Sequence, residues 1–205
     1  MKSTFYGILA SIDWNSNRWK ELPTEEDLDH SNFKYVVENG ITFTAINFGH
    51  EIFPADAEGN YWGLIPQMAK TMPDVNKSRY VEVVFLKSNN WRDKQNYIVG
   101  IYAFPTFEKS FQPFPFKKLS TEFFANIKAQ PKNIHLLASP LKLLSKKDLV
   151  GFLPPGKQLG KQGFNYLTEE NVRNILDAIT QQNPSDKKFE SIKKQLVKHL
   201  DKTSK

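Results

Sequence analysis

The amino-acid sequence predicts an α+β domain, in which a mixed or antiparallel sheet is combined with helices near the C-terminus. Five or six short apolar segments have strand character, and the clearest amphipathic helices follow them along the chain. The strands expected at 79–87 and 96–105 are joined by so short a connection that they must be antiparallel neighbours. That connection argues against a doubly wound parallel sheet.

The expected strands are short runs of β-branched and aromatic residues. They lie at 4–10, 41–48, 79–87, 96–105 and 132–138, with a short sixth strand at 164–167. The segment 41–48 alternates apolar and polar side chains, which is typical of a half-buried strand. The segment 96–105 is almost continuously apolar, which is typical of a strand covered on both faces, and Gly100 within it indicates a bend or a close backbone approach. Residues 88–95 are expected to form a polar loop around Trp91.

Three helices are expected. The first spans 120–129, and the second begins after Thr168, an N-cap residue followed by two acidic residues in the first turn. The third spans 186–200 and has one apolar face, formed by Phe189, Ile192, Leu196 and Leu200. Because Asn183-Pro184-Ser185 interrupts the helical pattern, we expect residues 183–205 to form a separate basic helix that is dispensable for folding of 1–182.

The chain has 205 residues and a net charge of +6, and its positive charge is concentrated in two segments. Residues 117–161 contain nine Lys and Arg against two Asp and Glu, and residues 183–205 contain seven against three. Such segments suit a polyanion such as nucleic acid; a lysine-rich solvated surface is the alternative. The sequence contains no cysteine and no apolar run near the length of a membrane span. A cytoplasmic protein with no membrane partner is therefore expected.

Motifs for catalysis are missing from the sequence. It has no Walker P-loop, no G-x-G-x-x-G after a strand and no H-E-x-x-H, and its four histidines lack metal-ligand spacing. We therefore expect no catalytic residue, no metal and no cofactor. His50 beside Glu51 is one pair that could act as a general base, although no nucleophile adjoins it in sequence, and a structural histidine is favoured.

The tryptophans give the clearest functional indication. Trp14, Trp19 and Trp91 fall in expected loops, and Trp62 follows a turn at Gly59-Asn60. All four have polar neighbours, which suits stacking on a planar ring together with hydrogen bonds to its edge. A stacked base contributes roughly 1–3 kcal/mol, enough for two or three aromatic walls to offset the extrusion of a base from a duplex. The alternative is that the indoles are half-buried lids on the sheet.

The order of features over residues 79–180 resembles the PUA-like superfamily, and within it the EVE and YTH domains. The segment "YVEVVF", 80–85, leads through a polar loop to "IVGIYAF", 98–104. A strand at 133–138 is followed by "SPLKLL", 139–144, which corresponds to a short helix in EVE domains. Lys161-Gln162-Gly163 and then "LTEE", 167–170, continue the pattern. The segment around 23–75 is longer than these families have and is treated as an insert.

The resemblance implies a small, curved, mixed or antiparallel β-barrel flanked by helices over 1–182, with the C-terminal helix as an extension. It also implies a nucleic-acid reader that holds a modified, flipped-out base in an aromatic cage, as in modification-dependent restriction and antiviral defence systems. DNA is favoured over RNA as the partner, and a nuclease or motor protein would act beside it. The base-binding residues would be Trp14, Asn15, Asn17, Trp19, Trp62, Asn90 and Trp91. The phosphate-binding residues would be Arg18, Arg92, Lys157, Lys161 and Gln162.

Two alternatives remain open. The first is an enzyme, a nuclease or a base-modifying hydrolase, that uses His50 and Glu51. The second is a protein-interaction module whose amphipathic C-terminal helix docks a partner chain.

Overall fold

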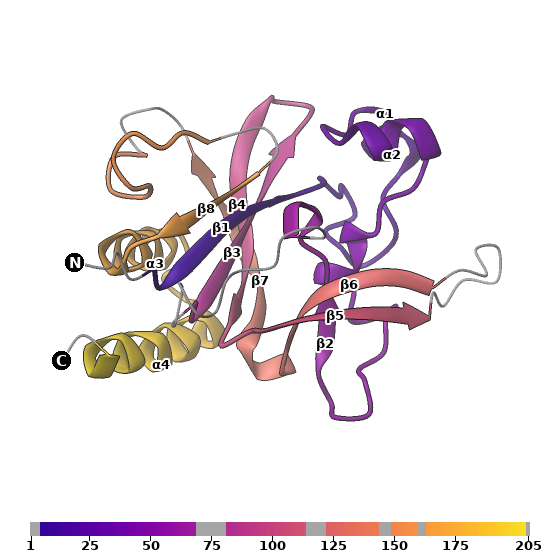
Figure 1. Ribbon diagram of the computed structural model, residues 1–205. Coiled ribbons are helices and arrows are strands. Elements are labelled where there is room, and N and C mark those ends of the chain that lie inside the picture. The colour runs from indigo at the N-terminus through magenta and orange to yellow at the C-terminus, as the bar shows by residue number, and fades with distance from the viewer. Residues whose placement is uncertain (1–4, 69–80, 114–121, 144–148, 160–162, 204–205) are drawn as a thin grey trace.

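The strands form two separate sheets in the computed structural model, which describes residues 5–68, 81–113, 122–143, 149–159 and 163–203. The five-stranded sheet has the order β7-β4-β3-β1-β8, and the three-stranded sheet has the order β2-β6-β5 (Figure 1). The bounds are β1 Gly7–Ile12, β2 Tyr61–Gly63, β3 Val83–Asn90, β4 Gln95–Ala103, β5 Thr106–Pro113, β6 Glu122–Ala129, β7 Ile134–Leu143 and β8 Phe164–Leu167. The helices are α1 Glu25–Asp29, α2 Lys34–Asn39, α3 Glu169–Gln182 and α4 Lys187–Thr203.

The expected α+β class is confirmed, and so is the antiparallel pairing of β3 with β4. β1 runs parallel to β3, and the remaining pairs in both sheets are antiparallel. The described strands do not close into a barrel, so the expected barrel is replaced by two sheets.

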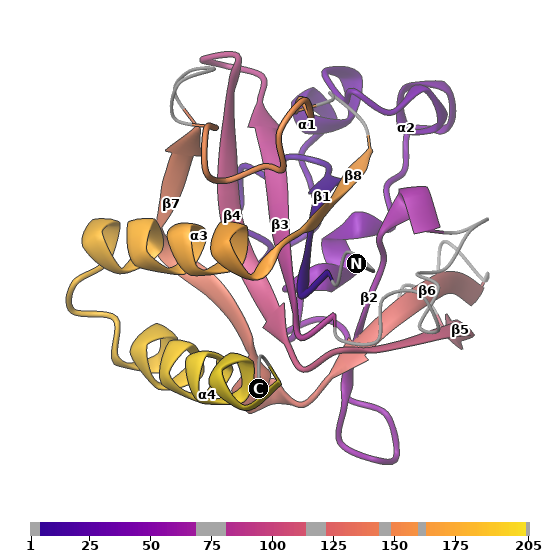
Figure 2. The ribbon, with the colours of Figure 1, turned by 60° about the vertical axis from the view of Figure 1, so that its left-hand side comes forward.

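The five-stranded sheet is covered on both faces, because side chains alternate between its two sides along each strand. Leu9 and Phe85 belong to the core shared with α3 and α4, whereas Ile8 and Val84 belong to the core shared with β6. Figure 2 shows α3 and α4 lying across one face of this sheet, with the three-stranded sheet beyond its other face. The continuous apolar run that predicted β4 follows from this double coverage. The close approach expected at Gly100 is also present, since a Cβ there would lie 2.5 Å from the His135 carbonyl oxygen.

The N-terminus of α3 is the one that the sequence predicts. The Thr168 hydroxyl accepts from the Asn171 backbone N–H at 3.2 Å, and the Asn171 side chain accepts from the Thr168 backbone N–H at 3.1 Å. This reciprocal capping box satisfies two N–H groups that the first turn of a helix leaves without partners.

The helix α4 is part of the main core, which does not support the expectation of a dispensable tail. Phe189, Ile192, Leu196 and Leu200 are at most 1% exposed, in the same cluster as α3 and the sheet. His135 of β7 also bonds Asp186, just before α4, with 2.6 Å between Nε2 and the carboxylate. The apolar face of α4 is occupied within this chain, so the interaction-module alternative is left with the lysines on the outer side of this helix.

Two segments have a different structure from the expected one. The strand expected at 41–48 is a 3-10 helix at Thr44–Asn47, because the Asn47 amide bonds the backbone of Thr44 and Leu64 and holds a local turn. The helix expected at 120–129 is β6, since this segment pairs with β2 and β5. Its apolar spacing fits either structure, and tertiary pairing decides.

Other boundaries also move. The strand β5 was not expected, and Pro140 and Leu141, assigned to a short helix by the resemblance, lie in β7. The expected polar loop at 88–95 is mostly strand, which leaves only 91–94 as the turn. The helices α1 and α2 lie in the segment treated as an insert.

Candidate functional site

The candidate site lies at the end of the five-stranded sheet where the C-terminal ends of the parallel strands β1 and β3 lie side by side. Because these strands run parallel, with Ile12 paired to Ser88, the residues that follow leave the sheet side by side. Asp13 and Trp14 come directly after β1. Figure 1 shows α1 and α2 beside this end of the sheet, next to the turn between β3 and β4.

The loop 13–23 folds back on itself through consecutive left-handed residues, Arg18 and Trp19, with φ of 54° and 56°. The Asn15 amide donates to the Glu21 carbonyl at 2.9 Å, and the Asn17 amide donates to the Leu22 carbonyl at 2.8 Å. Asn15 is 1% exposed, so its position does not support its expected contact with a base edge. Both amides hold the loop in shape.

The tight loop brings Trp14 and Trp19 together but gives them different roles. Trp19 is 3% exposed, and its ring meets Phe48 edge-on at 5.6 Å and Trp14 at 6.4 Å. It is a core residue, and this position does not support its expected role in base binding. Trp14 is half-buried, and its ring lies 5.9 Å from the ring of Tyr97 on β4.

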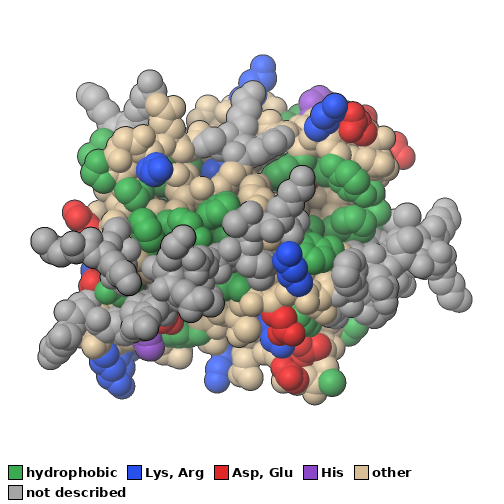
Figure 3. All heavy atoms as spheres, in the orientation of Figure 1, with side chains coloured by type: hydrophobic (Ala, Val, Ile, Leu, Met, Phe, Trp, Pro, Cys, Tyr) green, Lys and Arg blue, Asp and Glu red, His purple; other side chains and the backbone are tan. Residues whose placement is uncertain are grey.

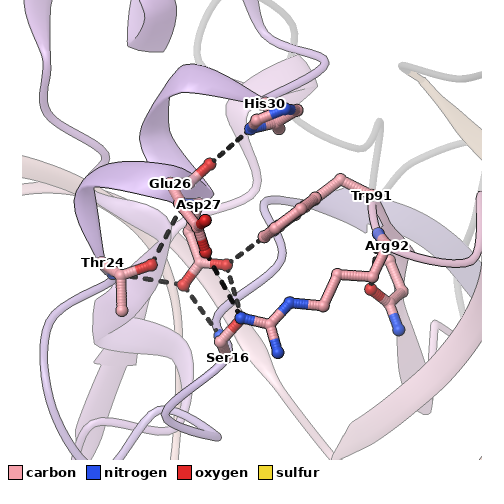
Figure 4. Close-up of polar contacts among 8 residues, drawn as sticks. Ser16, Thr24, Glu26, Asp27, His30, Trp91 and Arg92 are labelled. Carbon is pink, nitrogen blue, oxygen red and sulfur yellow. Dashed lines mark hydrogen bonds and ion pairs between the residues drawn. The ribbon is translucent and has the colours of Figure 1, made fainter.

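Trp91 lies at the turn between β3 and β4 and is covered by two exposed side chains. Its ring stacks on His30 with 4.4 Å between centroids and 19° between planes, and the Arg92 guanidinium lies 4.9 Å from its centroid. Figure 4 shows the imidazole and the guanidinium on opposite sides of the indole. The Arg92 guanidinium also reaches Glu26 at 3.4 Å, with both side chains more than half exposed. Both faces of Trp91 are thus covered by groups that a ligand could displace at small cost.

Asp27 of α1 is the polar centre of this cluster (Figure 4). Its carboxylate accepts from the Ser16 backbone at 2.9 Å, from the Ser16 hydroxyl at 2.7 Å and from the Thr24 backbone at 3.1 Å. It also accepts from the Trp91 indole nitrogen at 2.9 Å. Burial raises the pKa of Asp27, but the hydrogen bonds from Ser16, Trp91 and Thr24 outweigh it and hold the pKa below its usual value. Asp27 therefore fastens α1 to both neighbouring loops as an ionised acceptor.

A narrow polar crevice lies between these elements, lined by Asp13, Trp14, Asp27, His30, Lys87 and Asn89 among others. Its cavity volume is about 10 Å³, enough for one water molecule. Lys87 is 2% exposed, and burial lowers its pKa to about 8. Burial also raises the pKa of Asp13, opposed by hydrogen bonds from Ser31, Thr42 and Thr44. The crevice therefore holds buried acceptors and a buried donor beside aromatic rings.

Trp62 lies apart from the crevice, so the structure does not bring the four tryptophans into one slot. It belongs to β2, is 7% exposed and packs in a separate cluster with Phe53 and Leu64. Its indole nitrogen donates to Asp56 at 2.9 Å, and Lys128 lies 5.0 Å above its ring. Trp62 is therefore a structural residue of the smaller sheet, and its expected base-binding role is not supported by its position.

The remaining expected contact residues are dispersed. The Asn90 side chain accepts from the Arg92 backbone at 3.1 Å and shapes the turn. The Arg18 guanidinium donates to the carbonyl of Leu137 at 2.7 Å and so ties the loop to β7. Lys157 is exposed in the 149–159 segment, and Lys161 and Gln162 lie outside the described residues.

The His50 and Glu51 pair does not have the geometry of a catalytic dyad. His50 stacks on Tyr61 at 4.0 Å, and within the described ranges no hydrogen bond or ion pair joins it to the exposed Glu51. Burial, together with the charge of Lys188, lowers the pKa of His50 to about 4, so it is a weak base at neutral pH. The part of the chain that the structure describes also contains no cluster of three or more His, Asp or Glu arranged to hold a metal.

Several residues of the crevice were missed at the sequence level. Asp27 forms a capping box with Thr24, and the spacing Thr-x-x-Asp was readable. Lys87 ends an apolar strand, where a buried lysine is unusual. His30 gave no signal, because its contact with Trp91 depends on how α1 folds onto the β3–β4 turn.

Comparison of the chain with family models, with curated proteins and with solved structures gave no significant match in any of the three. The resemblance to PUA-like domains therefore rests on the sequence pattern.

The charged surface is mixed on the face seen in Figure 3, where basic side chains are scattered among acidic ones. Within the described residues, none of the helices has the length and apolar character to cross a membrane.

Proposed function

We propose that this protein binds nucleic acid and holds one extruded base against Trp91, with the polar edge of the base directed into the crevice. The observation that carries this proposal is that the ring stacked on Trp91 belongs to His30, an exposed side chain. A base that takes the place of His30 gains roughly 1–3 kcal/mol of stacking on Trp91, in exchange for the loss of the His30 stack.

The hydrogen-bonding groups of the crevice support a heterocyclic ring as the ligand. Asp13 and Asp27 supply acceptors, and Lys87 and Asn89 supply donors, close to the ring faces of Trp14 and His30. A base has both donors and acceptors along its edge, so such a mixed set can select one base over another. Modification of the base and the preference for DNA are supported by the resemblance alone.

The crevice must widen before a base can enter, because its cavity volume of about 10 Å³ holds only one water molecule. The contacts that keep it narrow are the bond from Trp91 to Asp27, the His30 stack and the ion pair between Arg92 and Glu26. Two of these three involve exposed side chains. The segment 24–33 is also held by hydrogen bonds from Ser31 to Asp13 and from Asn32 to Asn89. Opening therefore breaks partly buried bonds as well, and base binding has to offset their loss. Binding is therefore expected to be coupled to opening of this segment.

The test is a titration of labelled duplexes that carry one methylcytosine, one methyladenine, an abasic site or no mark, followed by fluorescence anisotropy. Trp91→Ala is expected to weaken binding to the preferred duplex roughly 5- to 150-fold, the loss of one stacked base. Trp91→Phe keeps a ring face but loses the bond to Asp27, and a smaller loss is expected. Trp62→Phe, a matched change of an indole outside the crevice, should leave affinity unchanged.

Two results would contradict the proposal: no measurable affinity for any of the duplexes, or equal affinity for Trp91→Ala and the unaltered protein. Thermal unfolding of each variant separates a lost contact from a lost fold. Affinity should also fall steeply with salt if lysines and arginines contact phosphates.

A further inference from the structure

A second hollow adjoins the crevice on the other side of Asp13. Its volume is about 240 Å³, below the range of pockets that enclose drug-sized molecules. Four aromatic side chains contribute to its walls, namely Phe33, Tyr35, Phe43 and Phe124, from three separate parts of the chain. Asp13 and Phe33 line both hollows, whereas Phe43 lines only this one.

The lining of this aromatic pocket is almost entirely apolar. Besides the hydroxyl of Tyr35, its polar side chains are those of Asp13, Thr42 and Thr44, and these three residues are at most 5% exposed. The Asp13 carboxylate accepts from the hydroxyls of Thr42 at 2.6 Å and Thr44 at 3.2 Å, and also from the Ser31 hydroxyl. Three hydroxyl donors suit an ionised carboxylate, which has only acceptors. Few lone pairs remain for a ligand, so a ligand would sense the charge of Asp13 more than its hydrogen bonds.

Asp13 brings negative charge to the pocket. Within the described residues, no lysine, arginine or histidine forms an ion pair with Asp13, and Lys87 lines the crevice rather than this pocket. A buried carboxylate exerts a stronger field than an exposed one, because the protein interior screens charge poorly. Lys87 lies on the crevice side of Asp13 and offsets part of this field, and the remainder favours a cation in the pocket over a neutral group of the same shape.

We propose that this aromatic pocket binds the trimethylammonium head group of a small organic cation. Such a group needs no hydrogen-bond acceptor, so the apolar lining suits it, whereas a primary ammonium or guanidinium would lose its hydrogen bonds to water there. Ring faces attract quaternary ammonium groups, and an acidic residue beneath them adds to the attraction. The rings of Tyr35 and Phe43 lie 6.5 Å apart and are inclined by 33°, so they pack against each other as part of one wall of the pocket.

This proposal does not depend on nucleic-acid binding. The experiment is a titration of the full chain, followed by NMR chemical shifts, with choline, with its neutral carbon isostere 3,3-dimethyl-1-butanol, and with ethanolamine. Choline is expected to bind at least roughly 3-fold more tightly than the neutral isostere, the smallest effect typical of a cation on aromatic rings. Ethanolamine should bind more weakly than choline, and the shifts should centre on residues 33–44.

Two variants locate the site. Phe43→Leu should weaken choline binding roughly 3- to 30-fold and affect the neutral isostere less. Asp13→Asn should bring choline affinity down to that of the isostere. Phe164→Leu, the same change on the distant strand β8, should alter neither.

Equal affinity for choline and the isostere would overturn the proposal, because the pocket would then bind apolar bulk alone. Shifts that fall elsewhere, or no binding at millimolar choline, would also overturn it. Thermal unfolding reports whether Asp13→Asn remains folded. If it does not, the ligand comparison and Phe43→Leu still decide.

Discussion

The two faces of the five-stranded sheet differ in what they bury. Behind the face covered by α3 and α4, the core is a continuous cluster of aliphatic and aromatic side chains that runs from Leu9 to Leu200. On the opposite side and at the ends of β1 and β3, polar groups are buried as well. Among the described residues, twelve polar or charged residues are buried; Asn171 lies in α3 and Asn183 at its C-cap, and the other ten lie outside α3 and α4.

This difference in buried polar groups separates the scaffold, on the helical side, from the candidate site at the ends of β1 and β3. A buried polar group costs free energy unless it is hydrogen-bonded, so a fold that only needed stability would not gather such groups at one end of the sheet. Asp13, Asp27 and Lys87 lie together there, and burial moves the pKa of Lys87 to about 8. Shifted ionisable groups beside aromatic rings in a concave region are typical of binding sites.

The largest expected effect tests whether the helical side is the scaffold. Leu196→Ala removes a fully buried side chain from the core shared by α4, α3 and the sheet. We expect the free energy of unfolding to fall by about 2–5 kcal/mol, as for other buried leucines. Urea denaturation followed by circular dichroism measures it.

Lys194→Ala, an exposed position two residues away on α4, is the control and should change stability by less than about 0.5 kcal/mol. If Leu196→Ala lowered the free energy of unfolding by as little as Lys194→Ala, α4 would be an annex, as the sequence suggested. The helical side of the sheet would then not be the scaffold.

The scaffold was largely predictable from sequence, and the reasons are local. The segments that became β3 and β4 are rich in β-branched and aromatic residues, and Thr168 caps α3 with its own side chain. The misassigned segments depend on distant partners. Thr42 and Thr44 alternate as in a strand, yet their hydroxyls bond Asp13, about thirty residues earlier.

The site was predictable only in part. Tryptophans among polar residues pointed to Trp14 and Trp91, which the structure places at the same end of the sheet, because a large ring in a loop needs a partner. The same signal failed for Trp19 and Trp62, whose partners Phe48 and Asp56 complete structural contacts. The position of a tryptophan in the sequence does not show whether its indole contacts a ligand or another side chain of the protein.

The second prediction tests whether the Asp27 carboxylate holds α1 against the loop 13–23 and the β3–β4 turn. Asp27→Ala removes the acceptor for Ser16, Thr24 and Trp91, and we expect a loss of about 1–3 kcal/mol at neutral pH. Because the folded pKa of Asp27 is lowered, its contribution is present above the unfolded value near 3.8 and disappears as the pH falls through the folded pKa. Urea denaturation at several pH values measures both quantities.

Asp29→Ala, an exposed acid on the same short helix, is the control for Asp27→Ala and should cost little at any pH. The difference between the unaltered protein and Asp27→Ala should shrink only in strong acid. A difference that is already small at neutral pH would show that the neighbouring loops hold α1 without this carboxylate.

The smallest expected effect compares one arginine from each region. Arg173 bonds Glu169 at 2.7 Å and Asp201 at 2.6 Å, and so joins α3 to α4, whereas Arg92 makes one exposed ion pair at 3.4 Å and covers Trp91. We expect Arg92→Ala to change the free energy of unfolding by no more than about 1 kcal/mol, and Arg173→Ala to cost more. The measurement is urea denaturation of both variants in the same buffer. If Arg92→Ala lowered the free energy of unfolding more than Arg173→Ala, Arg92 would be a fixed part of the scaffold. A base could then displace it from Trp91 only at a substantial cost in free energy.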